Sequence, residues 1–127
     1  MTMPTTAEAS PAEALKATSA NLRGAIGEEL TAGEDSHFSP EAASLLKFHG
    51  VYQQDDRDLR RELTRAGEPL EYSCMVRCSV PGGRLRREQW LAIDRLCDEV
   101  ADGSLRLTSR QGVQYHFVHK GDLHRLL

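Results

Sequence analysis

Two arginines stand inside apolar stretches where a charged side chain is unexpected. Arg77 lies between a valine and a cysteine, and Arg106 lies between two leucines. Placing a charge in such surroundings is costly unless it pairs with an opposite charge or faces a binding site. These two positions are therefore the first candidates for residues that bind an anion.

More polar side chains follow Arg106, in the turn after it and on the returning strand: Arg110, Gln114, His116 and Lys120. Because side chains alternate along a strand, Arg106 and Thr108 share one face, and Gln114 and His116 share one face. Such a cationic face suits a ligand with several carboxylates, or a small oxyanion. A solvated strand face, whose arginines and histidine form surface pairs, is an alternative of equal weight.

The elements that would position these side chains begin at residue 71. Apolar and β-branched residues predict strands over 71–80, 105–108 and 113–118. Between the first two strands, apolar residues at three- and four-residue spacing predict the main helix, over 86–101. Residues 122–127 are expected to begin a final helix. This β-α-β-β order predicts a two-layer α+β domain whose second sheet face is left open.

The first 70 residues have a different character. Residues 1–9 are expected to form a disordered tail, and Ser10 followed by Pro11 begins a helix that Gly33 ends. A second short helix is expected after Ser39-Pro40. Residues 47–70 show no clean period, and we interpret them as an ordered but irregular strap. The chain thus divides into a disordered or partly helical tail, an N-terminal helix-and-strap segment and a compact domain, over 1–18, 19–70 and 71–127.

The three cysteines do not form a metal-binding pattern. Cys74 and Cys78 share a strand face, and Cys97 lies on the apolar stripe of the main helix. We interpret all three as small buried hydrophobic residues. An iron–sulfur cluster usually takes four thiolates, and the spacing matches no cluster motif. The histidines form no metal-ligand pattern either.

Composition excludes several classes of protein. The formal net charge is −3, and 13 of the 16 basic residues are arginines. No apolar run is long enough to cross a bilayer, and the first residues lack the pattern of a secretory signal. We therefore expect that the protein does not associate with a membrane. The odd number of cysteines favours the reducing cytoplasm. The basic cluster at 84–87 is interpreted as a solvated helix start, and we expect no nucleic acid partner.

Three stretches resemble one known family. They are Leu-Lys-Phe-His-Gly-Val-Tyr-Gln-Gln-Asp-Asp-Arg-Asp at 46–58, Met-Val-Arg-Cys-Ser-Val-Pro-Gly-Gly at 75–83, and Gly-Ser-Leu-Arg-Leu-Thr-Ser-Arg-Gln at 103–111. In order and spacing they resemble the siroheme-dependent nitrite and sulfite reductases, near the amino-terminal ferredoxin-like half domain. The resemblance extends over about residues 19–127.

The resemblance implies roles for the cationic face. By position, Arg77 resembles the arginine that contacts the substrate oxyanion beside the siroheme iron. Residues that resemble those near or in contact with the siroheme are Lys47, Arg106, Thr108, Ser109, Arg110, Gln114 and His116. Ser109 stands where some members of the family have an asparagine. The 52–54 segment resembles the strap that packs near the cofactor.

The resemblance also implies an activity and partners. The chain would be the amino-terminal part of an enzyme that reduces sulfite to sulfide at a siroheme coupled to a 4Fe–4S cluster, with a flavoprotein or ferredoxin as electron donor. The cluster cysteines and a second half domain would lie in the remainder of the reductase, so this fragment, cut short at its carboxyl end, is expected to be inactive alone. The alternatives are a nitrite reductase of the same family and a non-catalytic siroheme-binding half domain.

Overall fold

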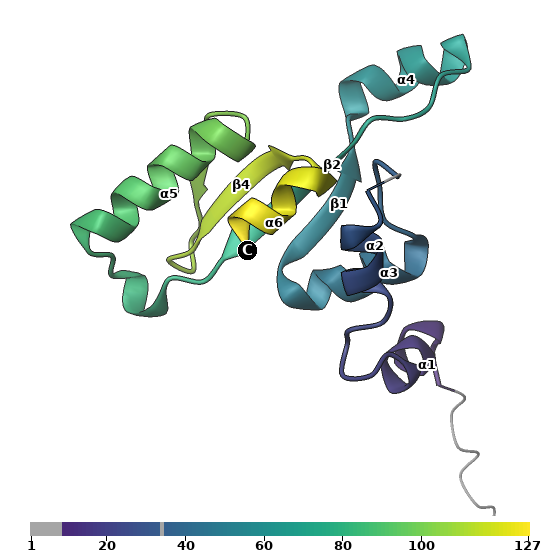
Figure 1. Ribbon diagram of the computed structural model, residues 1–127, viewed down its shortest axis with the longest axis horizontal. Helices are drawn as coiled ribbons and strands as arrows, with labels where there is room; N and C mark the ends of the chain where they lie inside the picture. Colours follow the sequence, from purple (N-terminus) through teal and green to yellow (C-terminus); the bar gives the residue numbers. More distant parts are fainter. Residues whose placement is uncertain (1–8, 34) are drawn as a thin grey trace, which may run out of the picture.

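The computed structural model describes residues 9–33 and 35–127, which fold around a four-stranded antiparallel sheet (Figure 1). The strands are β1 (Val51–Asp55), β2 (Tyr72–Cys78), β3 (Leu105–Leu107) and β4 (Val113–Val118). They lie side by side in the order β1-β2-β4-β3, so β2 and β4 are central and β1 and β3 are the edges. The α+β class predicted from the sequence is confirmed.

Six α-helices accompany the sheet: α1 (Pro11–Thr18), α2 (Ile26–Thr31), α3 (Pro40–Leu46), α4 (Arg57–Ala66), α5 (Arg87–Val100) and α6 (Leu123–Leu126). Three short 3₁₀ turns occupy Lys47–His49, Pro81–Gly83 and Lys120–Asp122. Helices α3, α5 and α6 supply buried side chains to the core, whereas α4 buries none and projects from the body (Figure 1). The predicted helices at 40–46 and 86–101 are confirmed, the latter with bounds one residue narrower at each end.

The core lies against one face of the sheet. The buried residues that the strands contribute to it are Val51, Cys74, Val76, Tyr115 and Val118. They pack against side chains of α3, α5 and α6, among them Leu46, Cys97 and Leu123. Alternation therefore turns the neighbouring strand residues to the opposite face, where no helix contributes to this core.

A bulge interrupts the pairing of β2 with β4. The register shifts between Cys74 and Val76, so Cys74 pairs with Val118 and Val76 pairs with Tyr115. Strand β4 has one residue more than β2 in this stretch. Phe117, with φ of +57°, accommodates the bulge and stays 49% exposed. Because of this bulge, Tyr115 and Val118 both reach the core although they are three residues apart.

The single helix predicted over residues 10–33 is wrong in its middle. It starts as expected, with the Ser10 hydroxyl accepting a hydrogen bond from the Glu13 amide, but α1 ends at Thr18 and α2 starts at Ile26. Ser19 is buried, and its hydroxyl donates to the Lys16 carbonyl and accepts from the Leu22 amide. This competition with the helix bonds ends the first helix.

The irregular strap predicted at 47–70 is also wrong, because this segment holds both β1 and α4. Val51 and Gln53 both face inward, and the inward Gln53 carboxamide bonds the Phe38 amide at 2.6 Å and the Phe38 carbonyl at 3.1 Å. A polar residue at a core-facing position hid the two-residue period. Helix α4 begins at Asp56, whose carboxylate accepts from the Asp58 and Leu59 amides.

Two further expectations concern the chain ends and the membrane. Most of the tail predicted at 1–9 lies outside the described residues, and the part of 1–18 that is described contains α1. Among residues 9–33 and 35–127, no helix combines the length and the apolar character that crossing a bilayer requires.

Gly50 ties the start of β1 to the backbone of Arg77, which yields a first prediction. Its φ is +80°, and a Cβ there would lie 2.9 Å from the Arg77 carbonyl oxygen. Gly50→Ala should lose about 1–2 kcal/mol of unfolding free energy from the left-handed backbone and more from this contact. Gly67, with φ of +70° and open space around it, is the matched control in urea unfolding. Equal losses in Gly50→Ala and Gly67→Ala would show that the contact costs nothing.

Candidate functional site

A row of three polar side chains crosses the open face of the sheet. Arg77 on β2 lies directly opposite Gln114 on β4, and Gln114 lies opposite Arg106 on β3. Directly opposite residues of antiparallel strands point to the same face. The two arginines therefore meet on one face with Gln114 between them, as strand alternation predicts. We call Arg77, Gln114 and Arg106 the arginine row.

Tyr52 joins this row from β1. It pairs with Met75, two residues before Arg77, so it is a diagonal neighbour of Arg77 on the open face. The Arg77 Cζ atom lies 5.4 Å from the centroid of the Tyr52 ring. A guanidinium at this distance over an aromatic face is attracted by the ring quadrupole. The resemblance placed the 52–54 segment near the cofactor, but the prediction of an irregular strap did not make Tyr52 a neighbour of Arg77, although Val51-Tyr52-Gln53 alternates inward and outward.

Gln114 links Arg77 to His116 through its side-chain amide. When the amide oxygen faces Arg77, it accepts from Nη2 at 3.2 Å and from Nε at 3.3 Å. The amide nitrogen then donates to His116 Nε2 at 3.3 Å. The opposite orientation would point amide N–H groups at guanidinium N–H groups, so the hydrogen-bond chemistry selects the first.

The state of His116 agrees with this orientation. Burial lowers the pKa of His116, the positive charge of Arg106 lowers it further, and Asp102 opposes both effects. A neutral imidazole can leave Nε2 unprotonated and accept from the Gln114 amide, whereas an imidazolium donates from both nitrogens. The donor-only guanidinium of Arg77 sets the direction of these hydrogen bonds, and a neutral His116 can accept the last of them.

The turn between β3 and β4 brings Thr108 and Arg110 to the end of the row. The Thr108 hydroxyl oxygen accepts from the Gly112 amide at 2.9 Å, and the two residues also pair through their backbones at 2.9 Å. A pocket of about 230 Å³ is lined by residues that include Arg77, Thr108 and Arg110. This pocket presents two guanidinium groups and a hydroxyl, a suitable donor set for an oxyanion or a carboxylate.

A second hollow lies at the other end of the open face. It holds about 380 Å³ and is lined by Arg106 and His116 together with Arg57 and three aspartates of the 55–58 segment. Asp55 binds Arg60 of α4 through two hydrogen bonds, and the hydrogen bond from Arg60 keeps the pKa of the Asp55 carboxyl low despite the opposing effect of burial. The charges in this hollow are mixed, so it is less suited to an anion than the pocket beside Arg77.

The arginines of the site are available for a ligand. Within the described part of the chain, ion pairs join Lys16 to Glu13, Arg60 to Asp55, and both Arg95 and Arg125 to Glu99. None of these pairs involves Arg77, Arg106 or Arg110. The surface pairing that would have made this a merely solvated face is therefore absent among the described residues.

Two of the predicted site residues are not brought to the row by any recorded contact. Lys47 is exposed on the first 3₁₀ turn, and Ser109 is exposed in the β3–β4 turn. Across residues 9–33 and 35–127, no hydrogen bond or ion pair links the Lys47 side chain to the arginine row. Their roles toward a cofactor stay predictions.

The cysteines occupy the core side of the sheet. Cys74 and Cys97 are 2% and 3% exposed, and Cys78 is half-buried against the same core. Burial raises the pKa of all three thiols, that of Cys74 to about 11. Neutral thiols that face a core are poor metal ligands. In the described residues, no group of three or more histidine, cysteine or acidic side chains could hold a metal ion.

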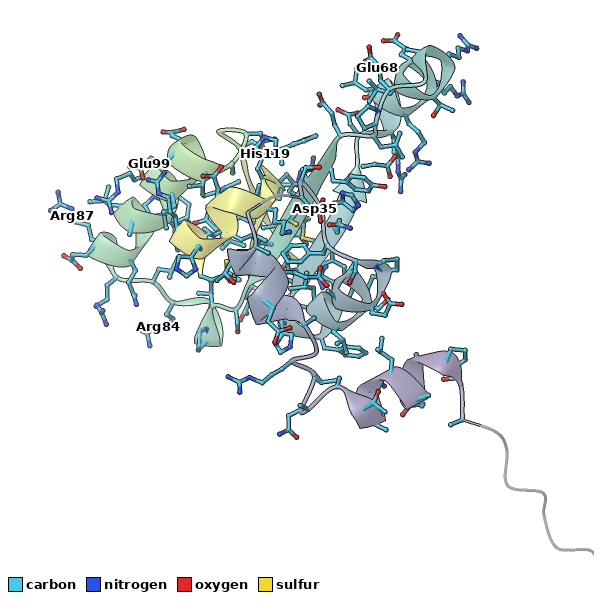
Figure 2. All side chains as sticks on the ribbon, turned by 45° about the vertical axis from the view of Figure 1, so that its right-hand side comes forward. Asp35, Glu68, Arg84, Arg87, Glu99 and His119 are labelled. Atoms are coloured by element: carbon cyan, nitrogen blue, oxygen red, sulfur yellow. The ribbon has the colours of Figure 1, made fainter. Side chains whose placement is uncertain are left out.

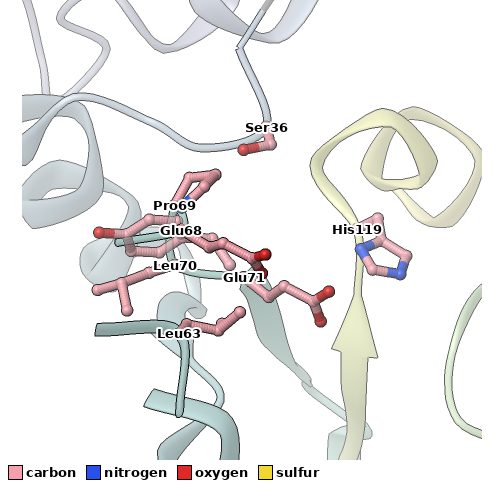
Figure 3. A pocket seen from close by; sticks show the side chains of 8 residues that line it. Ser36, Leu63, Glu68, Pro69, Leu70, Glu71 and His119 are labelled. Carbon is pink, nitrogen blue, oxygen red and sulfur yellow. The ribbon is translucent and has the colours of Figure 1, made fainter. Parts of the chain in front are cut away.

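Another hollow lies elsewhere in the molecule and carries acidic side chains. Figure 3 shows this pocket of about 590 Å³, with Glu68 and Glu71 from the segment before β2 and His119 on the far side. Its carboxylates would repel an anion. Arg84 and Arg87, at the start of α5, are exposed and extend outward from the body (Figure 2), as the solvated-helix-start interpretation predicts.

Comparison with known proteins decides what this arrangement belongs to. Residues 68–127 match the nitrite/sulfite reductase ferredoxin-like half domain. The chain is 48% identical to the sulfite reductase (NADPH) hemoprotein beta-component of Zymomonas mobilis over 124 residues. These residues are 93% of this chain and 21% of that protein. Residues 68–127 belong to the nitrite/sulfite reductase ferredoxin-like half-domain family. The predicted resemblance and the half-domain fold are confirmed.

Other relatives of the chain agree. The hemoprotein beta-component of Dickeya chrysanthemi is 46% identical over 122 residues, which are 91% of this chain and 21% of that protein. That of Yersinia pestis is 44% identical over 124 residues, or 93% and 21%. The chain thus spans about 21% of the length of these relatives. Its ferredoxin-like half domain contains Arg77, Arg106 and Gln114, whereas Tyr52 precedes it.

The buried ionisable groups of this reductase half domain predict how its stability depends on pH. Burial raises the pKa of Cys74 from 9.0 to about 11 and, with the neighbouring Cys78 and Cys97, that of Tyr115 from 10.0 to about 12. Both groups ionise more easily in the unfolded chain. The contribution of these two groups to the free energy of unfolding should therefore be constant below pH 9.0 and fall above it, by about 1.4 kcal/mol per pH unit for each group that has ionised only in the unfolded state.

Urea unfolding at increasing pH measures this slope. Cys74→Ala should remove the part that begins near 9.0, and Tyr115→Phe should remove the part that begins near 10.0. A profile that is flat up to pH 11, where Cys74 ionises in the folded chain, would contradict the burial of these groups.

Proposed function

We propose that this chain is the part of a sulfite reductase that binds siroheme carboxylates and the substrate oxyanion through the open face of its sheet. The observation that carries the proposal is the arginine row together with the Arg110 pocket. The row carries Arg77 and Arg106 on one face, the pocket at its end is lined by Arg77 and Arg110, and none of these three arginines pairs with a carboxylate among the described residues. Names of the relatives support sulfite over nitrite as the substrate.

The donor set fits such a cofactor. Siroheme is an iron tetrahydroporphyrin with several carboxylates on its rim, and a planar group of this kind needs a flat surface with fixed cationic donors. Arg106, Arg110 and Thr108 would bind carboxylates, Gln114 and His116 would contribute neutral contacts, and Lys47 and Ser109 would lie at the periphery. Siroheme would supply the iron that binds sulfite and exchanges electrons.

Arg77 has a separate role in this proposal. Its guanidinium lines the pocket beside the row and would neutralise the charge of bound sulfite. Arginine does not lose its proton in proteins, so Arg77 would bind electrostatically and would not act as a general base. Tyr52 and the paired strand hold it in place.

Other parts of the reaction would depend on groups outside this chain. The three cysteines face the core or pack against it, so the ligands of a 4Fe–4S cluster would come from the remainder of the reductase. We propose that electrons arrive from NADPH through a flavoprotein partner, because the relatives' names specify NADPH, with ferredoxin as the alternative donor. The protein would work in the cytoplasm.

The binding roles predict separable effects of two substitutions. The purified chain is titrated with siroheme and then with sulfite, each followed by the absorption of the macrocycle. Arg106→Ala should weaken siroheme binding by about 1.5–3 kcal/mol, the contribution of one hydrogen bond to a charged group. Arg77→Ala should leave siroheme binding near that of the parent and weaken sulfite binding by about 2–4 kcal/mol.

Two further variants are controls for this titration. Arg77→Lys keeps the charge but not the planar fork, so it should restore only part of the sulfite affinity. Arg87→Ala removes an exposed arginine of α5 and should change neither titration. If Arg77→Ala and Arg106→Ala both bind siroheme and sulfite like the parent, the proposed function is wrong.

The missing cluster ligands predict that this chain alone does not reduce sulfite. The three thiols are buried or half-buried and protonated at neutral pH, so no cluster should assemble to deliver electrons to siroheme. The assay uses the chain with added siroheme and reduced methyl viologen, and free siroheme is the blank. Sulfide production clearly above that blank would show that the chain is catalytic by itself.

A further inference from the structure

The Arg77 side chain is held from two directions. Its guanidinium carbon lies over the Tyr52 ring, with 5.4 Å between Cζ and the ring centroid. The Gln114 oxygen lies beside the Nε edge of the guanidinium, 3.2 Å from Nη2 and 3.3 Å from Nε. The ring contact and the hydrogen bond shared by two nitrogens both restrict the movement of the guanidinium.

The backbone also holds Arg77 in position. Its amide donates to the Gly50 carbonyl at 2.8 Å, and the close approach of Gly50 leaves no room for a side chain there. Arg77 also sits in the central strand β2, which is paired on both sides. The fold therefore fixes both the backbone of Arg77 and its guanidinium group.

The hydrogen bonds to Gln114 decide which donors of Arg77 remain free. A guanidinium has five N–H groups in a rigid plane. The Gln114 oxygen takes the Nε–H and one Nη2–H, which lie on the same edge. The two Nη1–H groups and the second Nη2–H remain, and one Nη1–H together with that Nη2–H forms the end of the fork that lies furthest from the backbone.

His116 completes this arrangement. Arg77 can only donate, so the Gln114 oxygen is turned toward it and the Gln114 amide nitrogen donates to His116 Nε2 at 3.3 Å. Arg106 and Asp102 are the charged groups that act on the imidazole, and Arg57 and Asp55, Asp56 and Asp58 line the hollow that His116 also lines. Burial and the Arg106 charge lower the pKa of the imidazole against the opposing effect of Asp102, which favours the neutral form that can accept.

We propose that Tyr52 and Gln114 are positioning residues that orient Arg77 so that it meets an oxyanion end-on, through Nη1 and Nη2, while its Nε edge stays bound to Gln114. The proposal rests on the proposed function for the identity of the anion and adds how the arginine is presented. Because both positioning contacts come from the chain itself, the fork is oriented before any anion arrives. Preorganisation of this kind reduces the entropy that binding must overcome.

Nitrogen-15 NMR of the isotopically labelled chain tests the positioning directly. The Arg77 side-chain resonances are assigned by their loss in Arg77→Lys. In the parent, the Arg77 Nε–H should exchange with water at least about ten-fold more slowly than that of exposed Arg87, as one hydrogen bond of a charged group implies. Gln114→Met and Tyr52→Leu should each raise the Arg77 exchange rate toward that of Arg87.

Matched variants separate positioning from a general loss of structure. Tyr52→Phe keeps the ring and should leave the exchange rate as in the parent. Gln54→Met makes the same substitution at an exposed position of β1 and should have no effect. The backbone amide spectrum of β2 and β4 reports folding, and Gln114→Asn, which withdraws the amide by one methylene, replaces Gln114→Met if that variant does not fold. An Arg77 exchange rate equal to that of Arg87 in the parent, or unchanged in both Gln114→Met and Tyr52→Leu, would overturn the proposal.

Addition of sulfite to the same labelled chain distinguishes this proposal from the proposed function. End-on binding should shift the Nη resonances of Arg77 and leave Nε in place. A larger shift at Nε would overturn the end-on orientation. Slow Nε–H exchange without any response to sulfite would count against the substrate role of Arg77 in the proposed function, while the positioning by Tyr52 and Gln114 would stand.

Discussion

The pairing of β2 with β4 determines where the chemically active side chains lie. Val76 and Tyr115 face each other within the core, so the residues next to them, Arg77 and Gln114, must face each other on the open side. Burial of the apolar pair is strongly favourable, and a slip of one residue would bring a charge into the core. Burial of this apolar pair, which stabilises the sheet, therefore also keeps the side chains of the arginine row on its open face.

Much of the fold was predictable from the sequence because its main elements follow simple periods. The strand around Arg77, the helix at 87–100 and the two last strands obey the spacings expected of a half-buried sheet and an amphipathic helix. Placement of Arg77 and Arg106 on one face followed from strand alternation. Their proposed roles came from the family resemblance, which the comparisons support at the level of the family.

The remaining features depend on contacts that a single sequence does not reveal. Gln53 faces inward because the distant Phe38 backbone satisfies its amide, and this contact disguised β1 as an irregular segment. Ser19 ends a helix through two side-chain hydrogen bonds that only the folded chain displays. As a result, Tyr52 escaped notice as a neighbour of Arg77, since its strand had not been recognised.

The shortness of β3 has a consequence for how the protein behaves at high concentration. This edge strand has only three residues, Leu105–Leu107, and Leu107 is 75% exposed. An unpaired edge with an apolar side chain can template the addition of another chain, which leads to aggregates. Arg106 lies in the middle of that edge, and a charge on so short a strand opposes strand addition from a second molecule. The Arg106 guanidinium thus helps to prevent aggregation through this edge, whatever ligand it binds.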